Sequence, residues 1–252
     1  ILASAKIMNA KTAVKVPIET QPVYETTAER FALEMSSWPV ETLAEAFYCS
    51  MSIALENQLR FQSFFNDDEK IPALLAYNGH AYKYLQASSF SEADFRFAQS
   101  HLFITSFLYG LLRPLDKIHP YRMEAKVHLH AAEDQNMFAF WRSRLTDTLI
   151  EAVKKDDGVL IHLATEEYEH LFDWKRVCRE VKVVQPLFYV EKGDSMKVVS
   201  VYAKRCRGAM TRCIIQNKWH QPDELLAFNE AGFSYQPHYG DELHPHFIFK
   251  QT

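Results

Sequence analysis

One segment near the middle of the chain has the clearest secondary-structure signal. Apolar residues recur at helical spacing through residues 136–155, and the run Asp156-Asp157-Gly158 stops the helix. The β-rich stretch Val159–Leu163 follows immediately. A long amphipathic helix that leads directly into a buried strand favours a fold in which helices pack on a sheet.

Helical and β-like segments alternate irregularly through the rest of the chain. Helices are predicted over 28–37 with Thr27 as cap, from Pro39, over 51–65, from the capping box Ser91–Asp94 to His101, over 204–217, and from Pro222. Strands are predicted over 1–3, 73–77, 102–105, 159–163, 181–190 and 196–202, and 233–235 and 246–249 are predicted as closing edge strands. The runs 181–190 and 196–202 are expected to form a hairpin through the turn 192–194.

The order of these elements defines the fold class. There is no strict βαβ alternation, no internal repeat and no Gly/Ser-rich or charged linker. The sequence therefore predicts a single α+β domain over residues 1–252, with a mixed β-sheet and surrounding helices.

Composition excludes several classes of protein. The 252 residues are 48% hydrophobic and 24% charged, as in an ordinary globular protein. No apolar stretch is long enough to span a bilayer and no signal peptide opens the chain, so no membrane partner is expected. The four cysteines form no C-x-x-C pair and are interpreted as reduced thiols in the cytoplasm. A monomer is favoured.

Charge is concentrated in one segment. Residues 192–218 contain seven basic residues and one acid, Asp194, whereas the whole chain has a formal net charge of −4. Because the chain as a whole does not attract polyanions, any such site must be a local basic patch. On a helix from Lys204 the basic residues lie on one face and the apolar residues on the other, with Ile215 as the exception. The candidate DNA-binding residues are Lys204, Arg205, Arg207, Gly208, Arg212 and Lys218.

The helical basic face has two interpretations. It could be merely solvated, or it could bind phosphate, with Gly208 allowing a phosphate to approach the backbone. A second short helix from Pro222 would make residues 204–228 a helix-hairpin-helix-like element, which grips a DNA backbone without reading bases. Asp223 and Glu224 would oppose phosphate at the start of that second helix.

Several motifs resemble those of the YaaA family. They lie in the family's order along the chain, at Phe90–Phe95, Leu108–Asp116 with Pro120–Arg122, Tyr202–Arg212 and Phe228–Phe233. The family opening S-P-A-K is Ala3-Ser4-Ala5-Lys6 here, which keeps the lysine and loses the proline. The resemblance implies a mixed α/β domain with a positively charged cleft, DNA binding through a helix-hairpin-helix, and a role in surviving peroxide by limiting iron-driven damage. The expected partner is duplex or distorted duplex DNA.

A second group of cations is a candidate phosphate site. Lys6, Arg113 and Arg122 are expected to line the cleft. Asp116 is expected to pair with Arg113 and to fix the proline loop, which is the ordered loop Leu111–Tyr121 with its two prolines. An alternative function is an enzyme acting on a nucleotide or nucleic acid in the same cleft, with Glu167 or Asp116 as the acid or base.

Metal and cofactor motifs are not apparent. The pairs His128-x-His130 and His244-x-His246 lack a third ligand at a familiar spacing, so no metal site is predicted and an iron-binding protein is a weaker alternative. There is no P-loop and no G-x-G-x-x-G or G-x-S-x-G motif, so no cofactor and no catalytic residue are predicted.

Overall fold

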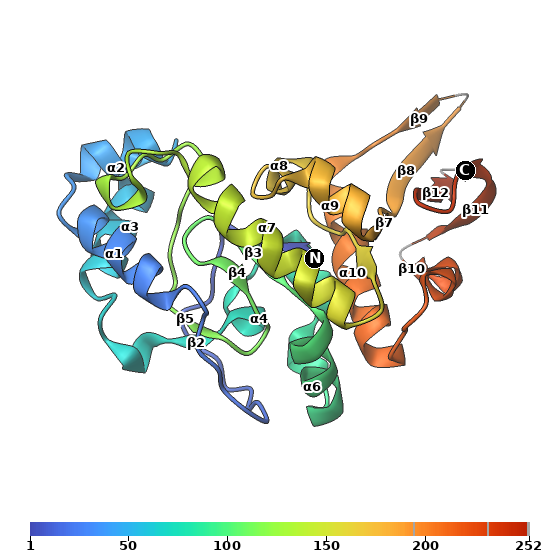
Figure 1. Cartoon of the computed structure of the whole chain (residues 1–252), viewed down its shortest axis with the longest axis horizontal. Helices are drawn as coiled ribbons and strands as arrows, with labels where there is room; N and C mark the ends of the chain where they lie inside the picture. The colour runs from blue at the N-terminus through green and yellow to red at the C-terminus, as the bar shows by residue number, and fades with distance from the viewer. Residues whose placement is uncertain (194, 231, 251–252) are drawn as a thin grey trace.

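The computed structural model describes residues 1–193, 195–230 and 232–250. Helices and small mixed sheets alternate along the chain and pack on one another (Figure 1), which confirms the α+β fold class. The α-helices are α1 (Glu25–Ser36), α2 (Val40–Ala46), α3 (Met51–Gln62), α4 (Ala73–Ala76), α5 (His80–Leu85), α6 (Glu92–His101), α7 (Met137–Lys155), α8 (Glu166–Glu169), α9 (Trp174–Glu180) and α10 (Ser200–Asn217). Short 3-10 helices are η1 (Asp67–Glu69), η2 (Ala87–Ser89), η3 (His130–Ala132) and η4 (Pro222–Ala227).

The strands form two main sheets and two strand pairs. They are β1 (Leu2–Ala3), β2 (Ile71–Pro72), β3 (Ile104–Ser106), β4 (Gly110–Leu112), β5 (Lys117–Ile118), β6 (Val159–Ile161), β7 (Lys182–Val184), β8 (Leu187–Lys192), β9 (Ser195–Lys197), β10 (Asn229–Glu230), β11 (Phe233–Gly240) and β12 (Pro245–Lys250). One sheet has the order β1-β3-β4, with β1 and β3 parallel and β3 and β4 antiparallel. The parallel pair β6-β7 lies beside this sheet, and the Leu163 amide, just after β6, donates to the carbonyl of Ile1, just before β1.

The second sheet has the order β10-β11-β12-β8-β9. Residues 233–235 and 246–249 form strands but are wrongly predicted as edge strands. Strand β11 lies between β10 and β12, and β12 lies in the middle of the sheet and pairs in parallel with β8. The predicted hairpin exists as β8 and β9, but both of its strands are shorter than expected. The predicted run 181–190 is divided into β8, which begins at Leu187, and β7, which pairs with β6. Of the run 196–202, β9 keeps only Met196 and Lys197, and residues from Ser200 onward already belong to α10.

Three local predictions are wrong at the N-terminal end of the chain. The run 73–77 is not a strand, because Ala73–Ala76 form the short helix α4, in keeping with the strong helix preference of Ala and Leu. Thr27 is not a cap, since α1 begins two residues earlier at Glu25. Pro39 occupies the N-cap of α2 rather than its first helical position.

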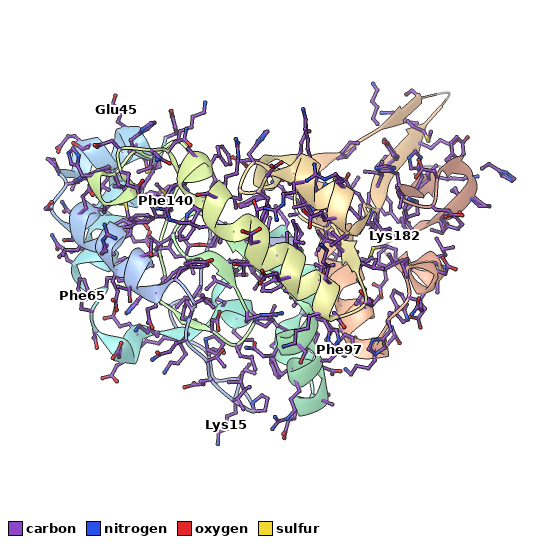
Figure 2. The ribbon with its side chains drawn as sticks, viewed as in Figure 1. Lys15, Glu45, Phe65, Phe97, Phe140 and Lys182 are labelled. Atoms are coloured by element: carbon purple, nitrogen blue, oxygen red, sulfur yellow. The ribbon has the colours of Figure 1, made fainter. Side chains whose placement is uncertain are left out.

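The strongest local signals are confirmed. Ser91 and Asp94 form the predicted capping box at the start of α6, with the Ser91 amide 2.9 Å from the Asp94 carboxylate. Helix α7 runs to Lys155 and leads into β6 as expected. Side chains fill the space between α1 and α7 (Figure 2). There the rings of Phe31 and Phe140 pack edge to face, with their centres 5.1 Å apart. Among the described residues, no helix combines the length and apolarity needed to cross a bilayer.

Candidate functional site

Two of the predicted cleft cations, Lys6 and Arg122, line a small cleft beside the end of β1. Ser4, Ala5 and Lys6 follow this strand, and they face the Tyr121–Glu124 segment and Glu167–Tyr168 at the start of α8. The enclosed space is about 30 Å³. This volume holds a few water molecules at most, so a nucleotide would have to bind at the mouth of the cleft.

A buried carboxylate balances the cations of this cleft. Glu124 is buried, and its carboxylate lies 2.7 Å from Lys6 Nζ and 2.8 Å from Arg122 Nη2. Arg122 Nη2 also donates to the Phe47 carbonyl at 3.2 Å. Because Glu124 accepts from both cations and Glu167 adds a second carboxylate to the lining, the cleft has little net positive charge of its own.

A chain of hydroxyl groups lies behind the cleft. Ser106 Oγ accepts from the amides of Leu108 and Tyr109, so its own hydroxyl donates to Tyr121 Oη at 2.6 Å. Tyr121 Oη lies 2.8 Å from Tyr77 Oη, and burial raises the pKa of Tyr121 to about 12. Burial also raises the pKa of Tyr168, whose Oη lies 3.1 Å from Ser4 Oγ. These tyrosines therefore remain neutral hydroxyls at ordinary pH.

Arg113 does not share the cleft with Lys6 and Arg122. Its guanidinium lies 3.6 Å from the centre of the Phe103 ring and donates to the Ser100 carbonyl at 3.2 Å, in the lining of another cavity. The structure thus brings together two of the three predicted cleft cations. Asp116 does fix the proline loop, but it accepts from the backbone amide of Arg113 at 2.7 Å and from Thr20 Oγ1 at 2.7 Å rather than from the guanidinium.

The predicted role of Gly208 is wrong. A Cβ atom at this position would overlap the carbonyl oxygen of Ala81, because α5 crosses α10 there. Gly208 is buried under α5, so no phosphate can approach its backbone on that side. The glycine instead permits close packing of two helices.

Helix α5 also connects α10 to the cleft. A Cβ atom on Gly79, at the N-cap of α5, would lie 2.8 Å from the Cβ of Ala5. Tyr82 in the same helix donates its hydroxyl to the Ala3 carbonyl at 2.9 Å. The packing of α5 on both segments therefore places the middle of α10 one helix away from Ser4–Lys6.

Two of the predicted DNA-binding cations have partners within the chain. Arg212 donates to Glu230 at 2.8 Å and to the Gln86 side chain at 2.7 Å. Lys218 forms an ion pair with Asp94 and lies in the left-handed conformation that ends α10. These carboxylates neutralise the basic charge at the C-terminal end of the helix.

The three cations of the N-terminal half of α10 differ from these. Lys204 is exposed, whereas Arg205 and Arg207 are half-buried, and within the described parts of the chain none of the three forms an ion pair. The Arg205 guanidinium lies 5.3 Å from the centre of the Tyr84 ring and 5.6 Å from that of Tyr202. Burial lowers the pKa of Arg207, and no carboxylate contributes to that shift.

Residues 1–239 match the family model described as peroxide stress protein YaaA. The chain belongs to this family. It is 45% identical over 243 residues to a UPF0246 protein of Bacteroides thetaiotaomicron, covering 96% of this chain and 95% of that one. A UPF0246 protein of Phocaeicola vulgatus is 43% identical over 249 residues, which is 98% of this chain and 97% of that one, and one of Crocosphaera subtropica is 35% identical over 248 residues, 96% and 95%.

The YaaA-like motifs occupy the site just described. Tyr202–Arg212 forms the part of α10 that packs on α5, and Pro120–Arg122 supplies one wall of the cleft. The second helix of the expected helix-hairpin-helix is the six-residue 3-10 helix η4, in which Glu224 accepts from the Gln221 amide at 2.7 Å. Helix α10 packs chiefly on α5, whereas η4 packs on β11. The hairpin motif therefore stays a prediction.

Among the described residues, no three His, Cys, Asp or Glu side chains come together as a metal site would require. His130 lies 2.6 Å from Asp134, and His244 lies 3.0 Å from Asp241. Cys206 is buried in α10, and burial raises the pKa of its thiol to about 12. This thiol is therefore protonated at ordinary pH.

Proposed function

We propose that this chain binds DNA without sequence preference through Lys204, Arg205 and Arg207, and that this binding serves the peroxide response with which its family is associated. The observation that carries the proposal is Arg207, a half-buried cation with no carboxylate partner in the described chain. A charge withdrawn from water without a counter-ion has a free-energy cost, and an arriving phosphate would reduce that cost.

The neighbouring residues suit a phosphate backbone. Lys204 is exposed one turn before Gly208, and Lys83 is exposed on α5, the helix that packs against that glycine. Arginine and lysine contacts to phosphates supply affinity and carry no sequence information. A protein that coats DNA in this way would limit damage from iron-driven oxidants by occupying the backbone where they act.

The affinity for DNA should fall with salt concentration, but only moderately, because few phosphates are contacted. With three phosphates neutralised, the slope of log K against log salt should be about −3, and removing Arg207 should bring it to about −2. The measurement is fluorescence anisotropy of a labelled duplex titrated with the protein over a series of salt concentrations. Two duplexes of unrelated sequence should give the same affinity.

The matched control is Arg30→Ala, which removes an exposed arginine from α1, on the far side of the molecule from α10 (Figure 1). This variant should keep the wild-type slope, whereas Arg207→Ala should not. Absence of binding at about 50 mM salt, or equal slopes for the two variants, would contradict the proposal.

One observation favours the alternative, an enzyme acting on a nucleotide or nucleic acid. The cleft places Ser4, Lys6 and Glu167 in one lining, in front of the hydroxyl chain. If the binding proposal is correct, nucleic acid should be recovered unaltered after long incubation with Mg²⁺ or Fe²⁺, as judged by mass spectrometry of ends, bases and nucleotides. Loss of a catalytic group lowers the rate at least ~10²-fold. A product that forms with the wild type and disappears in Lys6→Ala or Glu167→Gln would therefore establish the enzyme instead.

A further inference from the structure

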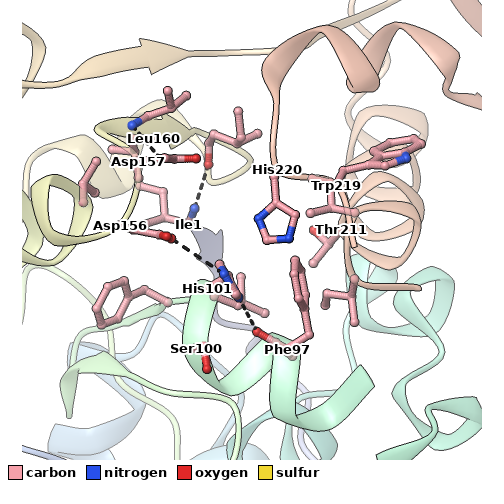
Figure 3. Close-up of a pocket in the computed structure, with 18 of the residues that line it drawn as sticks. Ile1, Phe97, Ser100, His101, Asp156, Asp157, Leu160, Thr211, Trp219 and His220 are labelled. Carbon is pink, nitrogen blue, oxygen red and sulfur yellow. Dashed lines mark hydrogen bonds and ion pairs between the residues drawn. The ribbon is translucent and has the colours of Figure 1, made fainter. Parts of the chain in front are cut away.

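A second cavity lies beside the C-terminal half of α10, beyond Lys204, Arg205 and Arg207 in the sequence. Its volume is about 130 Å³, and it is enclosed by the ends of α6, α7 and α10, by β6 and by residues 219–222 (Figure 3). The floor is apolar and includes Leu102, Leu160, Leu163 and Leu225, all of them buried. An apolar cavity of about 150 Å³ engineered in another protein binds benzene, so this one has room for a single aromatic ring.

The rim of the cavity is aromatic. The His101 ring stacks on Phe97 with ring centres 4.1 Å apart, and the His220 ring stands edge-on to Phe97 at 5.4 Å and to His101 at 5.6 Å. Figure 3 shows the His220 ring pointing toward the other two across the opening. Rings at these spacings offer faces and edges to an aromatic guest and to a cation at the opening.

The charged side chains of the lining favour a cation. The lining holds two carboxylates, Asp156 and Asp157, at the turn that ends α7, and, in the described part of the chain, one guanidinium, that of Arg113. The Ile1 amino group also lies in the lining, but it is buried and donates to the Ile161 carbonyl. The Arg113 guanidinium is occupied by the Phe103 ring and the Ser100 carbonyl. Asp157 accepts from the Val159 amide, whereas the Asp156 carboxylate is half-exposed and its nearest basic partner, His101 Nε2, is 3.9 Å away. Asp156 is therefore the carboxylate free to accept a donor from a guest.

We propose that this cavity is a binding site for a small aromatic amine, whose ring fills the apolar floor and whose ammonium group lies at the rim against Asp156. The size of the cavity fixes the ring, and the excess of carboxylate over available guanidinium fixes the sign of the substituent. Binding there is independent of DNA binding, because Lys204, Arg205 and Arg207 do not line the cavity.

Three probes of one shape test the proposal: benzylamine, the neutral benzyl alcohol and the anionic benzoate. Protein NMR would follow the indole N–H of Trp219, assigned by its loss in Trp219→Phe. Benzylamine should shift this signal saturably and bind about 3- to 5-fold more tightly than benzyl alcohol, as expected of one half-exposed ion pair, and benzoate should bind most weakly. The titrations run to about 20 mM, the weakest affinity expected of an eight-atom ligand.

Two variants and one control identify the site. Asp156→Asn should bring benzylamine to the affinity of benzyl alcohol, whereas Glu151→Gln, an exposed carboxylate of α7 outside the cavity, should keep the preference. Ala152→Leu, which extends a lining side chain into the space, should weaken both probes at least 10-fold. No saturable shift in the wild type, a preference that survives in Asp156→Asn, or full affinity in Ala152→Leu would each overturn the proposal.

Discussion

Gly208→Ala should lower the free energy of unfolding by about 3 kcal/mol or more, because α5 and α10 must separate to admit one methyl group. The added Cβ would overlap the carbonyl oxygen of Ala81, and a backbone atom cannot move aside as the end of a flexible side chain can. Among the described helices and strands, these two helices share the most extensive contact. Urea denaturation followed by circular dichroism measures the change.

The sign of the effect distinguishes packing from helix propensity. Glycine inside a helix is less stable than alanine by roughly 0.5–1 kcal/mol, so propensity alone makes Gly208→Ala stabilising. Gln216→Ala, an exposed position near the end of the same helix, serves as the control and should change stability by at most about 0.5 kcal/mol. If Gly208→Ala is as stable as the wild type, α5 and α10 do not cross as closely as the overlap of a Cβ with the Ala81 carbonyl requires.

Elements with strong local signals could be predicted from the sequence, and those defined by distant contacts could not. The start of α6 and the end of α7 are each signalled by a few neighbouring residues: the capping box of Ser91 and Asp94, and the turn residues that follow Lys155. The apolar run Ala73–Tyr77 carries no such signal, and a short apolar run suits a strand and a buried helix equally. The central place of β12 depends on its pairing with β8, some 60 residues away, which no local pattern reveals.

The candidate site shows the same division. Helical spacing correctly placed the basic residues on α10, but their partners lie far away in sequence: Lys218 pairs with Asp94, and Gly208 packs on Ala81. Only contacts of this kind separate the neutralised cations from those that remain available. The hydroxyl chain from Ser106 to Tyr77 was missed altogether, since isolated tyrosines in apolar segments are ordinarily core residues.

The buried His119 should make the protein lose stability as the pH falls below neutrality. Its side chain is 1% exposed, its ring lies 4.5 Å from that of Phe64, and its Nε2 has no hydrogen-bond partner among the described residues. Burial, aided by the positive charge of Lys70, lowers the pKa of His119 to about 4 against the opposing charges of Glu69, Asp67 and Glu25. The unfolded chain, with a histidine pKa near 6.5, therefore takes up the proton first.

The stabilising effect of neutral His119 is complete above pH ~6.5, declines as the pH falls, and is lost by pH ~4, a change of about 3 kcal/mol. His119→Gln removes this proton uptake, so its free energy of unfolding should vary less with pH than that of the wild type between pH 4 and 6.5. Urea denaturation at half-unit pH intervals measures both proteins. His162, whose pKa burial also lowers, is present in both and cancels from the difference. Parallel curves would mean that His119 takes up its proton at the same pH in the folded and unfolded protein, and hence that its ring reaches water or an acceptor.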